Sequence, residues 1–425
     1  MSVLRKNIVA LSVLQGANYI LPLITLPYLV RVLGPENFGR IAFAQAFIQY
    51  FVVAVNYSFD LSATRAVALA KDNPVELSRL FSSVMTIKIV IALLGFMLMA
   101  ALVAIFPVFE HDWVLYCLMY LTVVGNVLFP VWLYQGLGHM RHITAFTIMA
   151  RSLMVIAIFV FVTNSADYAI AAGLLSAGML MAGLIALVFI PRLVKIRLCW
   201  PGFSRLMQDF LAGRHIFVAM MGGSVYNSSN IFILGLVASP AVVGYFAAAD
   251  KLIKAVQGII QPVSQAVYPH IATLIARSRD EALTFIGKLL RIIGGGMLGV
   301  SIALFLLAAP ISEVLFGGKF DQSIHLIELM ALVPFLIGLN NVFGAQFLVQ
   351  FDLGRLLSFS IILPALVHVA VLYFIANNWG ASGVALLMIF TETFVLGIRI
   401  IGLQGENKQM LWHVLLARTP QTKNV

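Results

Sequence analysis

Residues 80–106 read LFSSVMTIKIVIALLGFMLMAALVAIF, and this stretch decides the class of the fold. It holds a single charged side chain, Lys88, and it is longer than the roughly 20 apolar residues that a helix needs to cross a bilayer. The rest of the chain is similar, because 61% of its 425 residues are hydrophobic and only 10% are charged. Such a chain cannot cover its surface with polar groups, which excludes a soluble globular enzyme. The sequence predicts an all-α integral membrane protein.

Apolar stretches of sufficient length recur along the whole chain and predict about twelve transmembrane helices. The first six are expected near residues 8–33, 39–63, 80–106, 113–135, 143–163 and 167–190. The second six are expected near residues 214–238, 241–268, 286–309, 323–349, 356–376 and 380–403.

The 27 Lys and Arg residues are divided unevenly between the two sides of the predicted helices. Most of them, with Arg151 and Arg399 counted among them, fall on the side of Arg5 and Lys6. The opposite side holds only three: Arg31, Arg40 and Lys319. The positive-inside rule therefore predicts that both termini are cytoplasmic. The net charge of +10 does not indicate a nucleic-acid partner, because no soluble domain gathers the basic residues on one face.

The turn between the first two predicted helices recurs between the seventh and eighth. Residues 34–39 read GPENFG and residues 239–244 read SPAVVG, so that Pro35 corresponds to Pro240 and Gly39 to Gly244 at an offset of 205 residues. This repeat predicts two pseudo-symmetric six-helix lobes related by an axis along the membrane normal. We expect one lobe at residues 1–195 and the other at 214–425, with a basic cytoplasmic connector at 196–213 and a short cytoplasmic tail.

Polar side chains form stripes on four of the predicted helices. Residues at steps of three and four share one face of a helix. The eighth helix carries Asp250, Lys254, Gln257, Gln261, Ser264, Gln265 and Tyr268. The second helix carries Gln45, Gln49, Asn56 and Asp60, and the first and seventh add Gln15, Asn18, Thr25, Asn227 and Asn230. Because such faces cannot point at lipid, we expect these four helices to line an aqueous cavity.

Charged residues also fall at membrane depth. The carboxylates are Asp60, Asp250, Glu328 and Glu392, and the lysines are Lys88, Lys251 and Lys254. Insertion of Asp, Lys or Arg at mid-span costs about 2.5–3.5 kcal/mol, so these residues indicate function. The alternative is that the polar stripes are interhelical hydrogen bonds of about 0.6 kcal/mol each, and that Asp250 and Lys254 neutralise each other. The four carboxylates are the candidates for ion coupling.

Motifs for cofactor and metal chemistry are missing from the sequence. It contains no GxxxxGK[ST] phosphate loop, no HExxH and no Cys/His metal spacing, and its two cysteines do not suggest a disulfide framework. We therefore expect no cofactor and no metal site. Transport would be driven by an ion gradient, a substrate gradient or the membrane potential.

Several segments resemble Wzx-type O-antigen flippases, which form part of the polysaccharide transporter branch of the MOP (MATE-like) superfamily. The segments are QGANYILP at 15–22, LPYLVRVLGPENFG at 26–39, LSATR at 61–65, WLYQG at 132–136 and QPVSQAVYP at 261–269. The resemblance implies a V-shaped, twelve-helix protein of the bacterial inner membrane. Such a protein moves undecaprenyl-diphosphate-linked repeat units from the cytoplasmic to the periplasmic leaflet by alternating access, without being an enzyme.

The resemblance also implies partners, and the polar stripes and buried charges independently supply candidates for individual roles. The partners are the lipid-linked oligosaccharide, membrane lipids, and the polymerase and chain-length regulator of the same pathway. The candidates for attracting the diphosphate or acidic sugars are Arg31, Lys88, Lys251 and Lys254. The candidates for lining the cavity are Gln45, Gln49, Asn56, Asn227, Gln257 and Gln261. Carboxylates such as Asp60 and Asp250 would exchange a proton or cation between the two states.

Two other functions are compatible with parts of this pattern. A multidrug or cation exporter of the same superfamily shares the two-lobe plan, but its cavity should be acidic, whereas Lys251 and Lys254 accompany Asp250 here. A membrane-embedded polymerase or ligase acting on lipid-linked sugars should have a large outward loop. The longest outward connector runs only from about Pro310 to Gln322, which argues against such an enzyme.

Overall fold

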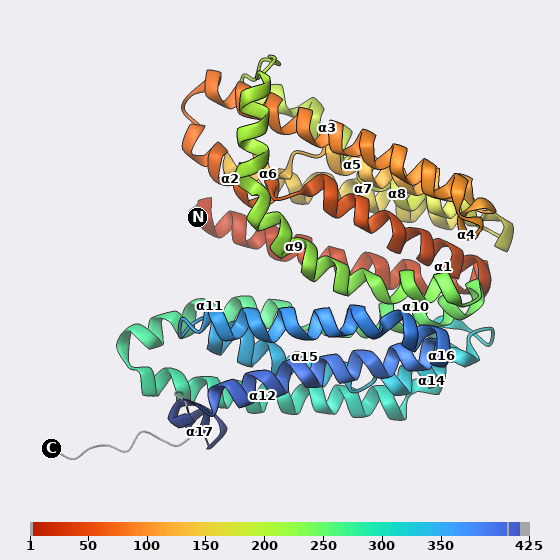
Figure 1. Ribbon diagram of the computed structural model, residues 1–425, viewed down its shortest axis with the longest axis vertical. Coiled ribbons are helices and arrows are strands. Elements are labelled where there is room, and N and C mark those ends of the chain that lie inside the picture. Colours follow the sequence, from red (N-terminus) through yellow and green to blue (C-terminus); the bar gives the residue numbers. More distant parts are fainter. Residues whose placement is uncertain (1–2, 406–407, 417–425) are drawn as a thin grey trace. The chain divides into compact units, whose positions relative to one another are not determined.

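The computed structural model describes the backbone of residues 3–405 and 408–416, and the side chains of this part except at 1–20, 22–23, 218–220 and 222–227. The described chain consists of helices and short connectors (Figure 1). The elements up to residue 193 are α1 (Val3–Asn56), α2 (Phe59–Ala70), α3 (Pro74–Ile105), α4 (Pro107–Glu110), α5 (Trp113–Leu128), α6 (Val131–Gly136), α7 (Met140–Phe161), η1 (Ser165–Asp167) and α8 (Tyr168–Leu193).

The remaining elements begin with α9, the helix that follows the predicted basic connector. They are α9 (Phe203–Val237), α10 (Pro240–Gln257), α11 (Ile260–Arg277), α12 (Arg279–Leu306), α13 (Ala308–Phe316), α14 (Asp321–Met330), α15 (Val333–Asn341), η2 (Val342–Leu348), α16 (Gly354–Leu403) and α17 (Lys408–Leu416). The predicted all-α fold is therefore confirmed.

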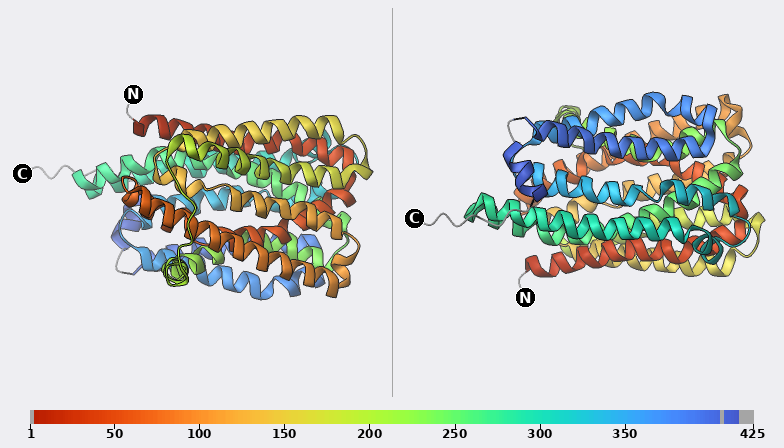
Figure 2. Two further views of the ribbon diagram at one scale, coloured as in Figure 1. Left: turned by 90° about the horizontal axis from the view of Figure 1, so that it is seen from above. Right: turned by 90° about the horizontal axis from the view of Figure 1, so that it is seen from below.

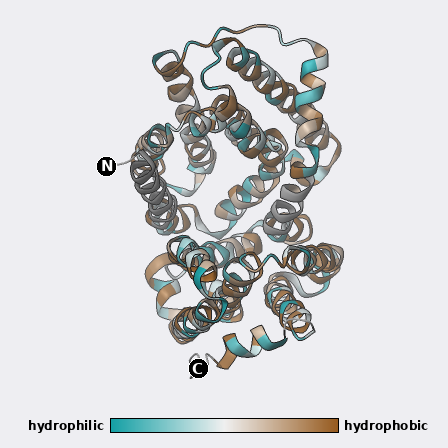
Figure 3. Ribbon diagram, turned by 90° about the vertical axis from the view of Figure 1, so that its left-hand side faces the viewer, coloured by the Kyte–Doolittle hydropathy of each residue, from teal (hydrophilic) through white to brown (hydrophobic). Residues whose placement is uncertain are grey.

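Two of the longest elements each contain two predicted spans. Within α1 the backbone turns at Gly34, where φ is 74°, and within α16 it turns at Gly380, where φ is 56°. Glycine adopts this left-handed conformation without the steric cost that a Cβ atom brings. Among the described residues, eight segments are long and apolar enough to cross a membrane. Figure 3, which looks along the helices, shows hydrophobic residues on helices throughout the chain.

Several of the predicted spans are interrupted, and three of these breaks concern the polar residues. Helix α1 ends at Asn56 before Tyr57, where φ is 49°, and α5 ends before Pro130. The prediction of a single helix over 241–268, with one polar face from Asp250 to Tyr268, was wrong, because α10 ends at Gln257 and α11 begins at Ile260. Pro262 has no N–H to bond the Gly258 carbonyl, which instead accepts from the Gln261 N–H at 3.3 Å.

The described chain divides into two compact units, Met1–Gly244 and Tyr245–Val425. In the first unit, α1 packs against α5, α7 and α9, and α8 packs against α5 and α7. Figure 2 shows the start of α1 running beside α7. In the second unit, α12 packs against α11, α15 and α17.

An aromatic cluster explains why α9 groups with the first unit. Phe232 of α9 stacks on Phe43 and Phe47 of α1, with ring centroids 5.6 and 5.7 Å apart. Phe43 and Phe47 also stack on Phe109, the buried aromatic residue of α4. Offset aromatic stacking of this kind adds to the free energy of burial. The functional lobes at 1–195 and 214–425 stay a prediction.

Candidate functional site

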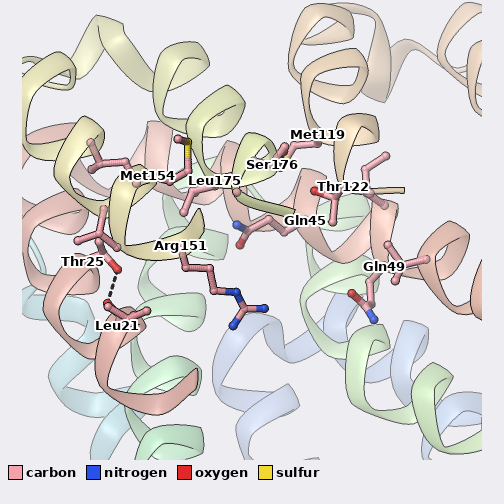
Figure 4. Close-up of a pocket in the computed structure, with 15 residues that line it drawn as sticks. Leu21, Thr25, Gln45, Gln49, Met119, Thr122, Arg151, Met154, Leu175 and Ser176 are labelled. Carbon is pink, nitrogen blue, oxygen red and sulfur yellow. Dashed lines mark hydrogen bonds between the residues drawn. The ribbon is translucent and has the colours of Figure 1, made fainter. Parts of the chain in front are cut away.

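A polar pocket of about 400 Å³ lies inside the first unit (Figure 4). It is formed by residues of α1, α5, α7 and α8. Its polar lining residues are Thr25, Gln45, Gln49, Thr122, Arg151 and Ser176. Figure 4 shows that the guanidinium group of Arg151 and the amide groups of Gln45 and Gln49 line the same pocket. The pocket therefore combines one permanent cation with amide and hydroxyl groups. The helices that line it are long and apolar enough to span a membrane.

The charge count assigned Arg151 to the cytoplasmic side, which stays a prediction. The structure places it near the middle of α7, within the candidate span Met140–Phe161. A count of basic residues on each side of the membrane cannot show which of their side chains points into the interior of the protein. The signal that could have found it is its position inside the predicted span 143–163.

A second polar cluster surrounds Lys88 of α3, whose exposed fraction is only 1%. Its Nζ donates to the backbone oxygen of Asn126 at 2.8 Å and to Oδ1 of Asn56 at 3.3 Å. The half-buried Asp60 interacts electrostatically with the Lys88 ammonium group. Three predicted residues, Asn56, Asp60 and Lys88, therefore come together here. Sequence reasoning missed Asn126 of α5, which is a lone amide in an apolar run.

Two of the segments that carry the family resemblance contact each other beside this cluster. Thr64 of α2 donates from Oγ1 to the backbone oxygen of Asp60 at 2.8 Å, and the same Oγ1 lies 3.3 Å from the backbone oxygen of Trp132. A Cβ atom on Gly136 would lie 2.5 Å from the side chain of Val67. Gly136 therefore allows α6 to pack closely against α2.

The repeated turns also meet, and they do so reciprocally. A Cβ atom on Gly39 would overlap the backbone oxygen of Pro240, and a Cβ atom on Gly244 would overlap the backbone oxygen of Pro35. All four residues belong to the first unit as the contacts define it. A reciprocal contact is typical of two elements related by a two-fold axis. The offset of 205 residues thus corresponds to a contact in the structure.

The charged residues of α10 form an ion pair rather than isolated charges. Oδ2 of Asp250 lies 2.7 Å from Nζ of Lys254, and the two side chains are 3% and 44% exposed. Oδ1 of Asp250 is buried and has no hydrogen-bond partner among the described residues. Lys251 is half-buried beside them. Of the amides predicted on the same face, Gln257 is half-buried at the end of α10 and Gln261 is exposed on α11.

A third buried network lies in the second unit. Glu392 of α16 accepts a hydrogen bond from Nδ2 of Asn340 at 2.8 Å, and Arg399 donates to the backbone oxygen of Asn340 and to Oγ of Ser360. Arg399 is 5% exposed. It lies one turn before the end of α16, within the candidate span Gly354–Leu403, and its predicted cytoplasmic side stays a prediction. Glu328 is not part of this network; its Oε2 lies 3.9 Å from Nδ1 of His325.

The remaining predicted residues do not converge on one place. Arg31 is exposed on α1. The side chain of Asn227 lies outside the described residues, as do those of Gln15 and Asn18. Within the described residues, no group of three or more His, Cys, Asp and Glu side chains could hold a metal ion.

Similarity to known proteins agrees with this architecture. Residues 4–275 match the family described as "Polysaccharide biosynthesis protein". A protein of Escherichia coli (strain K12), provisionally named an O-antigen transporter, is 32% identical over 404 residues, which cover 94% of this chain and 96% of the relative. A protein of Shigella dysenteriae with the same provisional name is 28% identical and covers 92% of this chain and 98% of the relative.

Solved structures show the same fold at low identity. The lipid II flippase MurJ, in an inward closed conformation, aligns with a TM-score of 0.67 at 12% identity, over 95% of this chain and 89% of MurJ. An inward-facing multidrug resistance transporter of the MATE family, within the MOP superfamily, also aligns with a TM-score of 0.67, at 16% identity and over 97% and 98% of the two chains. The relatives are named as transporters and not as enzymes. The chain therefore belongs to the polysaccharide biosynthesis protein family, and its fold is that of the MOP-superfamily transporters.

Proposed function

We propose that this protein is a flippase that moves undecaprenyl-diphosphate-linked O-antigen or polysaccharide repeat units from the cytoplasmic to the periplasmic leaflet by alternating access. Family membership and two relatives named for O-antigen transport support a polysaccharide cargo. The fold shared with a lipid II flippase supports a cargo that carries a lipid.

The observation that carries this proposal is the pocket around Arg151. A guanidinium group binds phosphate with two parallel hydrogen bonds, and amide and hydroxyl groups satisfy the hydroxyls of sugars. Gln45, Gln49 and Arg151 supply both kinds of group in one pocket of a membrane-spanning unit. No carboxylate is among the residues that line it in the described part of the chain.

Other predicted residues keep their roles within the proposal. Arg31, Lys251 and Lys254 are the further candidates for attracting the anionic cargo, with Asn56, Asn227, Gln257 and Gln261 along its path. The carboxylates proposed for coupling to an ion gradient are Asp60, Asp250, Glu328 and Glu392. Among these, Asp250 combines a buried position with an oxygen that has no hydrogen-bond partner among the described residues.

The location and partners follow from the same proposal. Both termini would be cytoplasmic, in a protein of the bacterial inner membrane. The polymerase and the chain-length regulator of the pathway would act on the repeat unit after its release into the periplasmic leaflet.

The proposal is tested by transport of a defined lipid-linked oligosaccharide in proteoliposomes that contain the full-length protein. We expect Arg151→Gln to lower the initial rate at least about tenfold, since loss of a charged hydrogen-bond pair is worth about 1.5–3 kcal/mol. Arg151→Lys should retain part of the rate, because lysine keeps the charge without the fork. The matched control is Arg192→Gln, which removes an exposed cation at the end of α8. Equal rates for Arg151→Gln and this control would contradict the proposal.

A multidrug or cation exporter is the second candidate, because the MATE transporter aligns as well as the flippase does. A cationic cargo would require acidic groups in the pocket, whereas the polar groups that line the described pocket are a guanidinium group, amides and hydroxyls, beside apolar side chains. Efflux of an organic cation by the same proteoliposomes, without movement of the lipid-linked oligosaccharide, would favour this candidate.

A further inference from the structure

Lys88 lies where two interrupted helices end. Helix α1 ends at Asn56, and α5 ends two residues before Pro130. The backbone oxygen of Asn126 would normally accept from the N–H four residues later, but residue 130 is a proline and has no N–H. Nζ of Lys88 occupies the place of that missing donor, at 2.8 Å.

The surroundings of this ammonium group are those of a cation site. The C-terminal end of a helix carries partial negative charge, and here two such ends meet. Oδ1 of Asn56 lies 3.3 Å from Nζ, and the carboxylate of Asp60 adds a full negative charge nearby. In many transporters, unwound backbone carbonyls and the C-terminal ends of half-helices coordinate Na⁺ at the level of such breaks.

The position of Lys88 limits what else it can do in this conformation. Its exposed fraction of 1% leaves no surface for a bulky cargo to contact. Asn56 also donates to Oδ1 of Asn126 at 3.4 Å, so the two amides that flank Lys88 are held to each other. The half-helices α2 and α6 that follow the two breaks are packed together through Thr64 and Gly136. The ammonium group therefore lies at the point from which both half-helices depart.

We propose that the Lys88 ammonium group is a tethered substitute for a free monovalent cation at the joint break of α1 and α5. Its ligands are the backbone oxygen of Asn126 and Oδ1 of Asn56, and the carboxylate of Asp60 acts on it electrostatically without contacting it directly. The wild-type protein needs no dissolved cation at this place, because the cation is covalently attached. Removal of the side chain leaves a cavity with the ligands and charge to bind a small cation such as Na⁺ or methylammonium. This inference goes beyond the proposed function and does not depend on the cargo.

The test is the thermal unfolding of purified full-length protein in matched chloride salts. The bulky cation N-methyl-D-glucamine is compared with Na⁺, K⁺ and methylammonium at constant ionic strength. We expect the wild-type midpoint to be the same in all four salts. Lys88→Ala should unfold at least about 5 °C lower in N-methyl-D-glucamine chloride and should regain at least about half of this loss in Na⁺ or methylammonium.

Two further variants separate this role from a purely structural one. Lys88→Gln fills the site with an uncharged donor, so it should be destabilised without regaining stability in any salt. Lys88→Ala combined with Asp60→Asn should weaken or lose the cation response, because the nearby negative charge is gone. Lys71→Ala, at an exposed position after α2, is the matched control and should respond like the wild type.

Each result of the salt series either supports the proposal or overturns it. Purification of Lys88→Ala only in the presence of Na⁺ or methylammonium would support the proposal as directly as a shifted midpoint. A loss of equal size in every salt, a wild-type midpoint in every salt, or failure to fold in all four salts would overturn it.

Discussion

Each unit of the molecule buries one cation against the backbone oxygen of an asparagine at an irregular helix. In the first unit Lys88 donates to the oxygen of Asn126, next to the break at Pro130. In the second unit Arg399 donates to the oxygen of Asn340, directly before the π-helix η2. Both cations have a carboxylate as an electrostatic partner, Asp60 for Lys88 and Glu392 for Arg399.

The difference between the two sites lies in how the charge is bound. The lysine is a compact charge, and its hydrogen bonds to Asn126 and Asn56 both come from one nitrogen atom. The arginine spreads its charge over a planar fork, of which Nη1 bonds Asn340 and Nε bonds Oγ of Ser360 at 3.0 Å. A monatomic cation can replace the compact ammonium group of a lysine. It cannot replace a guanidinium group, whose planar fork makes several hydrogen bonds in fixed directions. The first unit therefore has the site that a free cation can restore, and the second does not.

The largest effect is expected from Arg399→Ala. The change removes the donor to the Asn340 oxygen and the positive charge that acts on Glu392, and removing one charge from a buried network in this way costs about 3–5 kcal/mol. We expect most of the folded protein to be lost, as measured by the monodisperse peak of a fluorescent fusion in size-exclusion chromatography.

The salt series used for Lys88→Ala makes this a direct comparison. Neither Na⁺ nor methylammonium should restore Arg399→Ala, and Arg399→Lys should remain destabilised because it lacks the second branch of the fork. Restoration of Arg399→Ala by a small cation would show that the two sites are equivalent, and the comparison would fail.

A smaller effect is expected from Gly344→Ala in η2. A Cβ atom there would lie 2.8 Å from Nη1 of Arg399, so the guanidinium group would have to move. Overpacking of this kind costs about 1–3 kcal/mol. The unfolding midpoint should fall, and the fall should shrink in an Arg399→Lys background, where the clashing group is absent. The control is Gly397→Ala, where a Cβ atom meets no neighbour within 4 Å. Equal losses for the two alanines would show that Gly344 does not make room for Arg399.

The membrane fold was predictable from the sequence because it depends on composition and on the length of apolar stretches. The repeat was found through Pro35, Gly39 and their counterparts, since turns need particular residues. The helix breaks were missed because the hydropathy pattern continues across them. Pro130 was nevertheless a visible signal, as was Gly258 four residues before Pro262.

The candidate site was less predictable than the fold. The polar stripes identified Gln45 and Gln49, which the structure places in one pocket with Arg151. Arg151 and Arg399 were missed because sidedness was inferred from charge alone, and the rule gives no information on the direction of a side chain. Asn126 and Asn340 act partly through backbone oxygens, which no residue pattern records.

The smallest effect is expected for a cation outside the membrane. Arg205, in the first turn of α9, has its Nη2 2.8 Å from Glu76 and its Nε 3.0 Å from Asp209, and its side chain is 33% exposed. Burial alone would lower the pKa of Arg205, but the hydrogen bonds to Asp209 and Glu76 outweigh it and raise this pKa. Because water and salt screen such pairs, each is worth about 0–1 kcal/mol. Arg205→Gln should therefore lower the unfolding midpoint by only about 1–3 °C at low ionic strength, and by less in 0.5 M salt, roughly three times the physiological ionic strength.

The same increase in salt should leave the losses of Lys88→Gln and Arg399→Ala unchanged, since buried charges are screened much less. A double-mutant cycle of Arg205→Gln with Glu76→Gln measures the pair itself. The coupling free energy could instead be as large as the stability loss of Arg399→Ala and insensitive to salt. That result would show that exposure does not determine how much these cations contribute to stability. A coupling near zero at high salt would confine the large contributions to Lys88 and Arg399, where the cation is buried against the backbone oxygen of an asparagine.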